Sequence, residues 1–153
     1  MAEKMDKAEP IDMSWLPDLI GYNLRCAQVA VFQHFSKTIG EAEISPPQYG
    51  ALVLIDANPG ISQSAIASAL RFDRSTLVQI IDRLEDRKLV IREVSATDRR
   101  SHALKLTDLG QVLLAELDVL VNKHEQHMTR HLSGDERHTL MELLAQVYKE
   151  AED

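Results

Sequence analysis

Apolar residues recur at steps of three and four along most of this chain of 153 residues. That spacing places them on one side of a helix, so most of the chain is predicted to be helical. The first such stretch can begin near Ser14 and Pro17, since proline is tolerated in the first turn, and it runs to about Gly40. A helix of about seven turns projects from a small domain, so its apolar side needs a partner.

Shorter helices with clear end signals follow. Ser45 and Gln48 can form a capping box, and the Asn-Pro-Gly sequence at 58–60 ends the helix they begin. Ser62 can cap a third helix over about residues 63–69, and after a turn at 71–72 Asp73 can cap a fourth. The fourth helix has one apolar face, made of Leu77, Ile80, Ile81 and Leu84.

The pattern becomes that of short strands after Lys88. Residues 89–94 and 103–106 are predicted strands, and the polar segment 95–101 between them makes a hairpin with a basic tip. Two short helices joined by a tight turn and followed by a hairpin form a winged helix–turn–helix. The sequence therefore predicts a mainly α fold with a small β-wing.

Two more helices complete the predicted fold. Thr107 can cap a long fifth helix that breaks near residues 131–134, and Ser133 with Glu136 can open the last one. We expect residues 1–13 to be a disordered lead-in, 45–106 to form the winged DNA-binding region, and 14–44 with 107–153 to form a helical dimerisation region. The exposed apolar stripes of the long helices favour a homodimer.

Charge is unevenly distributed along the chain. Its net charge is −7, yet residues 62–107 hold nine basic and six acidic residues, a local net charge of +3. Local charge governs attraction to phosphate, so the acidic total does not exclude DNA binding. With no apolar run of about 18 residues and no apolar signal-peptide core, we expect a cytoplasmic protein without a membrane partner.

The start of the fourth helix carries side chains suited to base recognition. A recognition helix presents its first residues to base edges in the major groove. Arginine can bind guanine in a bidentate manner, glutamine can bind adenine, and hydroxyl groups are adaptable. The candidate residues for base recognition are Arg74, Ser75, Thr76, Gln79 and Arg83. The alternative is that Asp73 and Thr76 only cap the helix.

Two other groups are candidates for contact with the DNA backbone or the minor groove. The start of the third helix offers hydroxyl, amide and backbone N–H groups to a phosphate, although Ser62 also acts as an ordinary cap. The hairpin tip offers two guanidinium groups, which suit the negative potential of a narrow minor groove. These residues are Ser62, Gln63 and Ser64, and Asp98, Arg99 and Arg100.

The sequence from 73 to 77 and from 84 to 90 resembles the recognition helix and first wing strand of MarR-family regulators. Residues 98–101 and 104–110 are similar to that family's wing and the entry to its fifth helix. The similarity extends over about residues 18–148. The resemblance implies a homodimer whose dimerisation region consists of the first, fifth and sixth helices. It also implies that the protein represses transcription by binding operator DNA, and that a small effector binds between the dimerisation region and the winged domain.

A finer resemblance concerns the first helix and residues 54–60. They are similar to the branch of the family that represses hydroxycinnamate and related aromatic-acid catabolism, of which some members respond to an aromatic acyl-CoA thioester. The resemblance implies a small aromatic or acyl-CoA effector, with Arg25 as a cation for a carboxylate or a CoA phosphate. Arg25 can equally form an ordinary salt bridge. The candidate effector residues are Tyr22, Arg25, Val29, Phe32 and Tyr49.

A few residues could support other functions. Cys26 would permit redox sensing, but Arg25 is the only adjacent cation, so a small buried hydrophobe is expected. One face of the predicted fifth helix carries His124, His127 and His131. These side chains could bind a metal ion, or they could simply form a polar outer face of the helix. No catalytic constellation converges, so neither an enzyme nor a cofactor is expected. A sequence-indifferent architectural DNA-binding protein remains the alternative to a regulator.

Overall fold

The computed structural model describes residues 11–94 and 102–150 of the chain. Residues 1–10 of the predicted lead-in, and Asp98, Arg99 and Arg100 of the predicted wing tip, lie outside this part. The fold is mainly helical with one small antiparallel sheet, which confirms the predicted class. Within the described residues, no helix is long and apolar enough to cross a membrane.

The first helix, α1 (Ile20–Ile39), begins later than the sequence predicts. A short 3₁₀ turn (Leu16–Asp18) precedes it, and Leu19 has extended backbone with φ −80° and ψ 128°. The Asn23 amide donates to the carbonyls of Pro17 and Leu19, at 2.7 and 2.8 Å. These two bonds satisfy carbonyl groups of the turn and hold it at the start of the helix.

The capping signals of the next three helices are confirmed. They are α2 (Pro46–Ala57), α3 (Gln63–Leu70) and α4 (Arg74–Asp86). Ser45 and Gln48 form the predicted capping box, Ser62 caps α3 and Asp73 caps α4. Arg71, in the left-handed region at φ 56°, ends α3 and turns the chain into α4.

The sheet has one strand more than predicted. Its order is β1 (Ile61–Ser62), β3 (His102–Leu106) and β2 (Val90–Val94), all antiparallel. Leu104 lies opposite Ile61 on one side and Arg92 on the other. Because β1 has only two residues, it is too short to show the alternation of apolar and polar residues by which a strand is predicted from sequence.

Two long helices close the chain, α5 (Asp108–Met128) and α6 (Gly134–Glu150). Thr107 caps α5, and Ser133 with Glu136 forms the predicted box at the start of α6. The end of α5 comes a few residues before the predicted break. There the Thr129 hydroxyl donates to the Glu125 carbonyl at 2.7 Å, so this carbonyl of the last turn has a hydrogen-bond partner.

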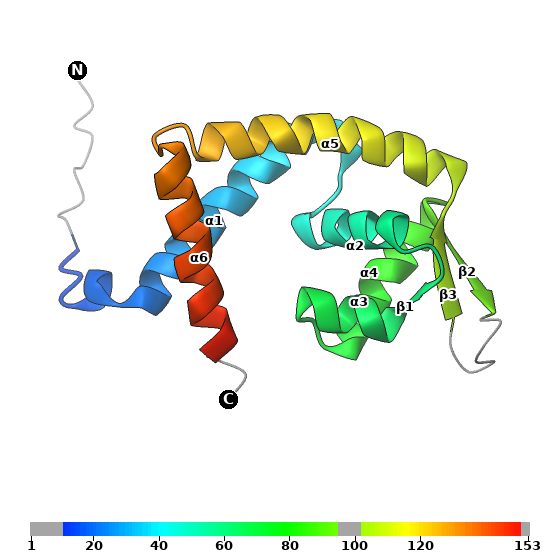
Figure 1. Cartoon of the computed structure of the whole chain (residues 1–153), viewed down its shortest axis with the longest axis horizontal. Coiled ribbons are helices and arrows are strands. Elements are labelled where there is room, and N and C mark those ends of the chain that lie inside the picture. The colour runs from blue at the N-terminus through cyan, green and yellow to red at the C-terminus, as the bar shows by residue number, and fades with distance from the viewer. Residues whose placement is uncertain (1–10, 95–101, 151–153) are drawn as a thin grey trace, which may run out of the picture.

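The core lies in the winged region and also includes Phe35 and Ile39 near the end of α1 and Leu114 and Leu117 in the first half of α5. Figure 1 shows α5 crossing above the winged region, with α6 descending in front of α1. The fully buried side chains include Leu52, Ile55, Ile66, Leu77, Ile81, Leu84, Val90, Leu104 and Leu117. Outside this core, α6 has no buried side chain among its described residues.

Candidate nucleic-acid interface

The first turn of α4 is organised by Asp73. Its carboxylate accepts from the Thr76 backbone N–H at 2.8 Å and from the hydroxyls of Ser75 and Thr76 at 2.5 and 2.6 Å. These bonds hold the pKa of the Asp73 carboxyl well below its usual range, and the bond from Ser75 has the largest effect. An ionised carboxylate only accepts, so both hydroxyls donate to it and keep lone pairs for another partner.

The longer candidate side chains of α4 are exposed. Arg74, Gln79 and Arg83 all lie at the surface, while the opposite face of the helix packs into the core. Within the described residues, neither Arg74 nor Arg83 has an ion-pair partner. Their guanidinium groups are therefore available to base edges or phosphates.

The start of α3 differs in character from that of α4. Ser62 is half-buried and accepts from the Ala65 N–H at 3.2 Å, whereas Ser64 is exposed. Gln63 is half-buried, and one terminal atom of its amide lies 3.1 Å from Arg92 Nε and 3.0 Å from Arg92 Nη2. Because both guanidinium nitrogens can only donate, that atom is assigned as the amide oxygen. Sequence reasoning did not single out Arg92, whose role depends on a contact between β2 and α3.

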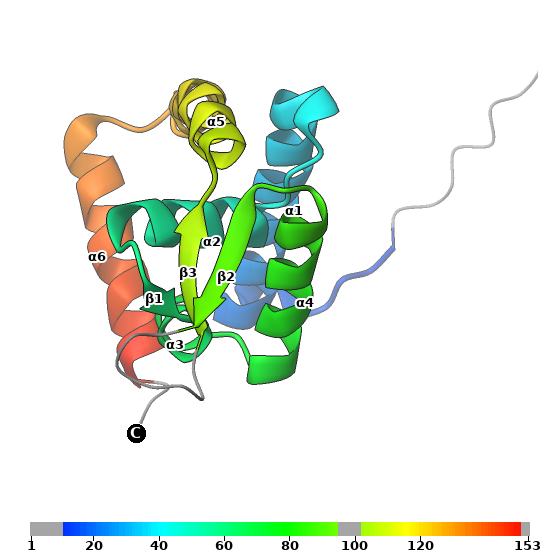
Figure 2. The same ribbon diagram turned by 90° about the vertical axis from the view of Figure 1, so that its right-hand side faces the viewer.

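The hairpin and the helices meet at one side of the molecule. In Figure 2, β2 and β3 run down to the lower side, where α3 and the start of α4 also lie. The strands lead there to the segment that holds Asp98, Arg99 and Arg100, which is outside the described residues. The described candidates from both helices thus share this side of the fold with the ends of the hairpin strands.

A contact between α2 and α5 lies next to the winged core. The Tyr49 hydroxyl donates to Asp118 Oδ1 at 2.8 Å, and the Tyr49 ring lies 6.1 Å from that of Phe35 on α1. Burial, with the bond to Asp118, raises the pKa of Tyr49 to about 12. Tyr49 therefore remains a neutral hydrogen-bond donor where α1, α2 and α5 meet.

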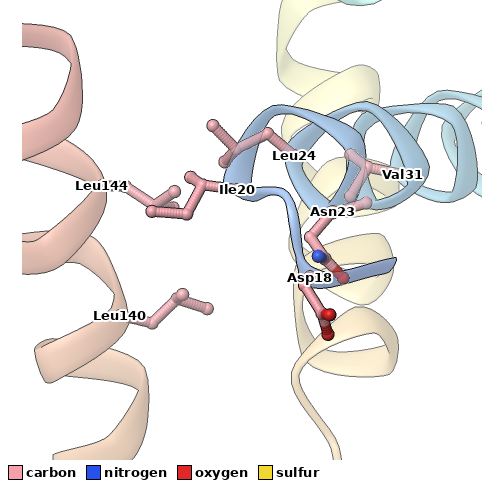
Figure 3. Close-up of a pocket in the computed structure, with 8 residues that line it drawn as sticks. Asp18, Ile20, Asn23, Leu24, Val31, Leu140 and Leu144 are labelled. Atoms are coloured by element: carbon pink, nitrogen blue, oxygen red, sulfur yellow. The ribbon is translucent and has the colours of Figure 1, made fainter. Parts of the chain in front are cut away.

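The other candidate effector residues lie apart from Tyr49 along α1. Arg25, Val29 and Phe32 are exposed, and their spacing places them with Tyr22 on one stripe. A pocket of about 430 Å³ opens between α1 and α6, with none of these residues in its lining. Figure 3 shows Leu140 and Leu144 of α6 facing Ile20 and Leu24 of α1 across it.

The Cys26 thiol is exposed in the single chain, so the expectation of a buried hydrophobe is wrong at this level of assembly. Cys26 forms a hydrogen bond with Tyr22, one turn earlier on α1, and this bond raises the pKa of Tyr22. The exposure arises because Cys26 lies on the part of α1 that projects beyond the core.

The histidines of α5 contact α1, so the expectation of a polar outer face is wrong for His124. That side chain is only 1% exposed, and its Nδ1 lies 2.7 Å from Nδ1 of His34. The ring of His127 stacks on that of His34 at 4.2 Å, and His131 lies beyond the end of α5. Within the described residues, no group of three or more potential ligands could hold a metal ion.

We expect the stability of the fold to decrease as the pH falls below about 6.5. Burial lowers the pKa of His124, so the native state excludes a proton that the unfolded chain binds near its ordinary pKa. Stability therefore rises with pH through this window and is lost below it. Urea unfolding at about pH 7.5 and 5.5 measures the difference, which His124→Asn should reduce. An equal decrease in both proteins would assign the effect to other groups.

Comparisons with known proteins agree with this geometry. The sequence profile of the MarR family matches residues 43–101. A protein of Thauera aromatica, assigned as a transcriptional regulatory protein for the hcr operon, is 40% identical over 146 residues, which is 95% of this chain and 87% of that protein.

Solved structures of the transcriptional repressor CouR are similar along the whole fold. One, bound to a 23-mer DNA duplex, has a TM-score of 0.85 and 40% identity and covers 91% of this chain and 99% of its own. Another, bound to p-coumaroyl-CoA, has a TM-score of 0.85 and 39% identity and covers 92% and 99%. The chain belongs to the MarR family of winged-helix regulators.

Proposed function

We propose that this protein is a homodimeric transcriptional repressor that binds operator DNA and releases it when a small aromatic effector binds. The observation that carries the proposal is the first turn of α4. There Asp73 orients two hydroxyls beside the exposed Arg74, on a helix–turn–helix whose relative CouR was solved on DNA. We assign residues 45–106 to DNA binding, with the wing tip at Asp98, Arg99 and Arg100 in the minor groove.

The dimerisation region in this proposal is 14–44 with 107–153. Support comes from the apolar side chains that these helices leave exposed in the single chain. They include Ile20, Val29 and Phe32 on α1 and Leu140, Met141, Leu143, Leu144 and Val147 on α6. A second copy would cover these side chains and place two recognition helices about one DNA turn apart.

The effector we propose is an aromatic acyl-CoA thioester. Support comes from the similarity to CouR, which was solved with p-coumaroyl-CoA, and from the α1 stripe, where Arg25 can meet a phosphate or carboxylate. Effector binding would favour a dimer with unsuitable spacing between its recognition helices and so shift the population off DNA. In this proposal the protein is cytoplasmic, is not an enzyme and needs no cofactor.

The test is release of operator DNA by defined compounds. The operator is selected from random duplexes by the purified protein, and binding is measured with p-coumaroyl-CoA, p-coumarate, acetyl-CoA or CoA. We expect only the aromatic thioester to release the DNA. To move the protein from about 99% DNA-bound to about 99% DNA-free at saturation, the thioester must bind the DNA-free state about 10⁴-fold more tightly than the DNA-bound state.

Two other outcomes separate the parts of the proposal. If the protein binds the operator and none of the compounds releases it, the proposed repressor function stands and the proposed effector class is wrong. Equal affinity for the selected operator and random DNA would favour the architectural DNA-binding protein instead.

A further inference from the structure

The guanidinium group of Arg92 joins three elements of the winged region. Nη2 donates to Asp82 Oδ1 at 2.5 Å, and Nη1 donates to Glu85 Oε2; both acids belong to α4. Nε and Nη2 also donate to the Gln63 amide oxygen, at 3.1 and 3.0 Å, at the first residue of α3. Four of the five guanidinium N–H groups are therefore used, and the side chain is only 18% exposed.

One of these partners lies on the side of α4 that carries candidate base contacts. Asp82 follows Ser75 and Gln79 at helical steps of four and three, so the three residues share a face opposite the buried one. A carboxylate on that face would repel DNA phosphates unless a cation neutralised it. Arg92 reaches Asp82 from β2, and its planar fork lets it hold Glu85 at the same time.

We propose that Arg92 is a positioning residue for DNA recognition, which holds the start of α3, the recognition face of α4 and wing strand β2 in one fixed arrangement. It acts through Gln63, Asp82 and Glu85 rather than by touching a base. The inference rests on the proposed DNA-binding function.

The chain offers a matched control in the same sheet. Lys105 on β3 pairs with Glu93 on β2 at 2.6 Å, and both side chains are nearly half exposed. Lys105→Gln removes one positive charge from the wing strands, as Arg92→Gln does, but leaves the contacts to α3 and α4 intact. Arg92→Lys keeps the charge, but its single ammonium cannot reproduce the fork that joins three partners.

The experiment measures the affinity of each full-length variant for the operator selected by the wild type and for random DNA, at one salt concentration. We expect Arg92→Gln and Arg92→Lys each to lower the operator-to-random affinity ratio by at least about tenfold. Lys105→Gln should leave that ratio within about twofold of wild type. Circular dichroism and urea unfolding, recorded on the same samples, establish the folded fraction.

Two results would overturn the inference. If Arg92→Lys keeps the wild-type ratio, Arg92 acts only by its charge. If Arg92→Gln weakens operator and random DNA equally, its role is only to support the fold or to attract phosphate. Should either variant fold poorly, Glu85→Ala removes one arm of the contact and should lower the ratio in the same direction. A wild-type protein without operator preference would contradict the proposed function, a result distinct from either of these.

Discussion

Replacing Arg74 by alanine should lower the affinity for operator DNA by about fivefold to 150-fold, the effect of losing roughly 1–3 kcal/mol of base recognition. Arg74 is the first residue of α4 and is exposed, so its guanidinium can reach a base edge when the helix enters the major groove. Asp73 keeps its bonds to Ser75 and Thr76 in the variant, and the helix cap survives. Fluorescence anisotropy with a labelled operator duplex measures the change.

The matched control is Arg137→Ala. Arg137 lies on α6, half-exposed, with its Nη2 3.6 Å from Glu125, so its loss removes the same charge far from α4. We expect this control to change operator affinity by less than about threefold. A decrease in affinity for random DNA as large as that for the operator would identify Arg74 as a phosphate contact and not a base contact.

The parts of the fold that could be predicted from the sequence are those set by local chemistry. A hydroxyl or carboxylate that caps its own helix acts over three residues, so the ends at Ser45, Ser62 and Asp73 were predictable. The face of α4 that enters the core follows from a regular spacing of aliphatic residues. The first turn of that helix, with its exposed Arg74, was predictable for the same reason.

The features that the sequence did not reveal depend on contacts between distant segments. Arg92 of β2 meets Gln63 only because its long side chain reaches the first residue of α3, and His34 meets His124 across ninety positions of the chain. No local pattern marks either pair. The exposure of Cys26 likewise depends on how far α1 projects from the core, which spacing within α1 cannot determine.

Gly110→Ala should destabilise the fold by about 2 kcal/mol or more, although alanine favours a helix over glycine by about 1 kcal/mol. Gly110 is buried in the first turn of α5, and an added Cβ would lie 2.1 Å from the Leu89 carbonyl oxygen. That oxygen also accepts from the Thr107 N–H at 3.0 Å, so it cannot move away without weakening a bond that joins α5 to the winged region.

Thermal unfolding at one fixed protein concentration measures this effect, since an oligomer's melting temperature depends on concentration. A loss of about 2 kcal/mol corresponds to roughly 4–8 °C for a chain of this size. Gly134→Ala is the control, because a Cβ at the start of α6 meets nothing within 4 Å. Equal melting temperatures for Gly110→Ala and wild type would mean that α5 moves freely against the wing. The helix that joins the proposed dimer region to the DNA-binding region would then transmit little of a change in dimer shape to α4.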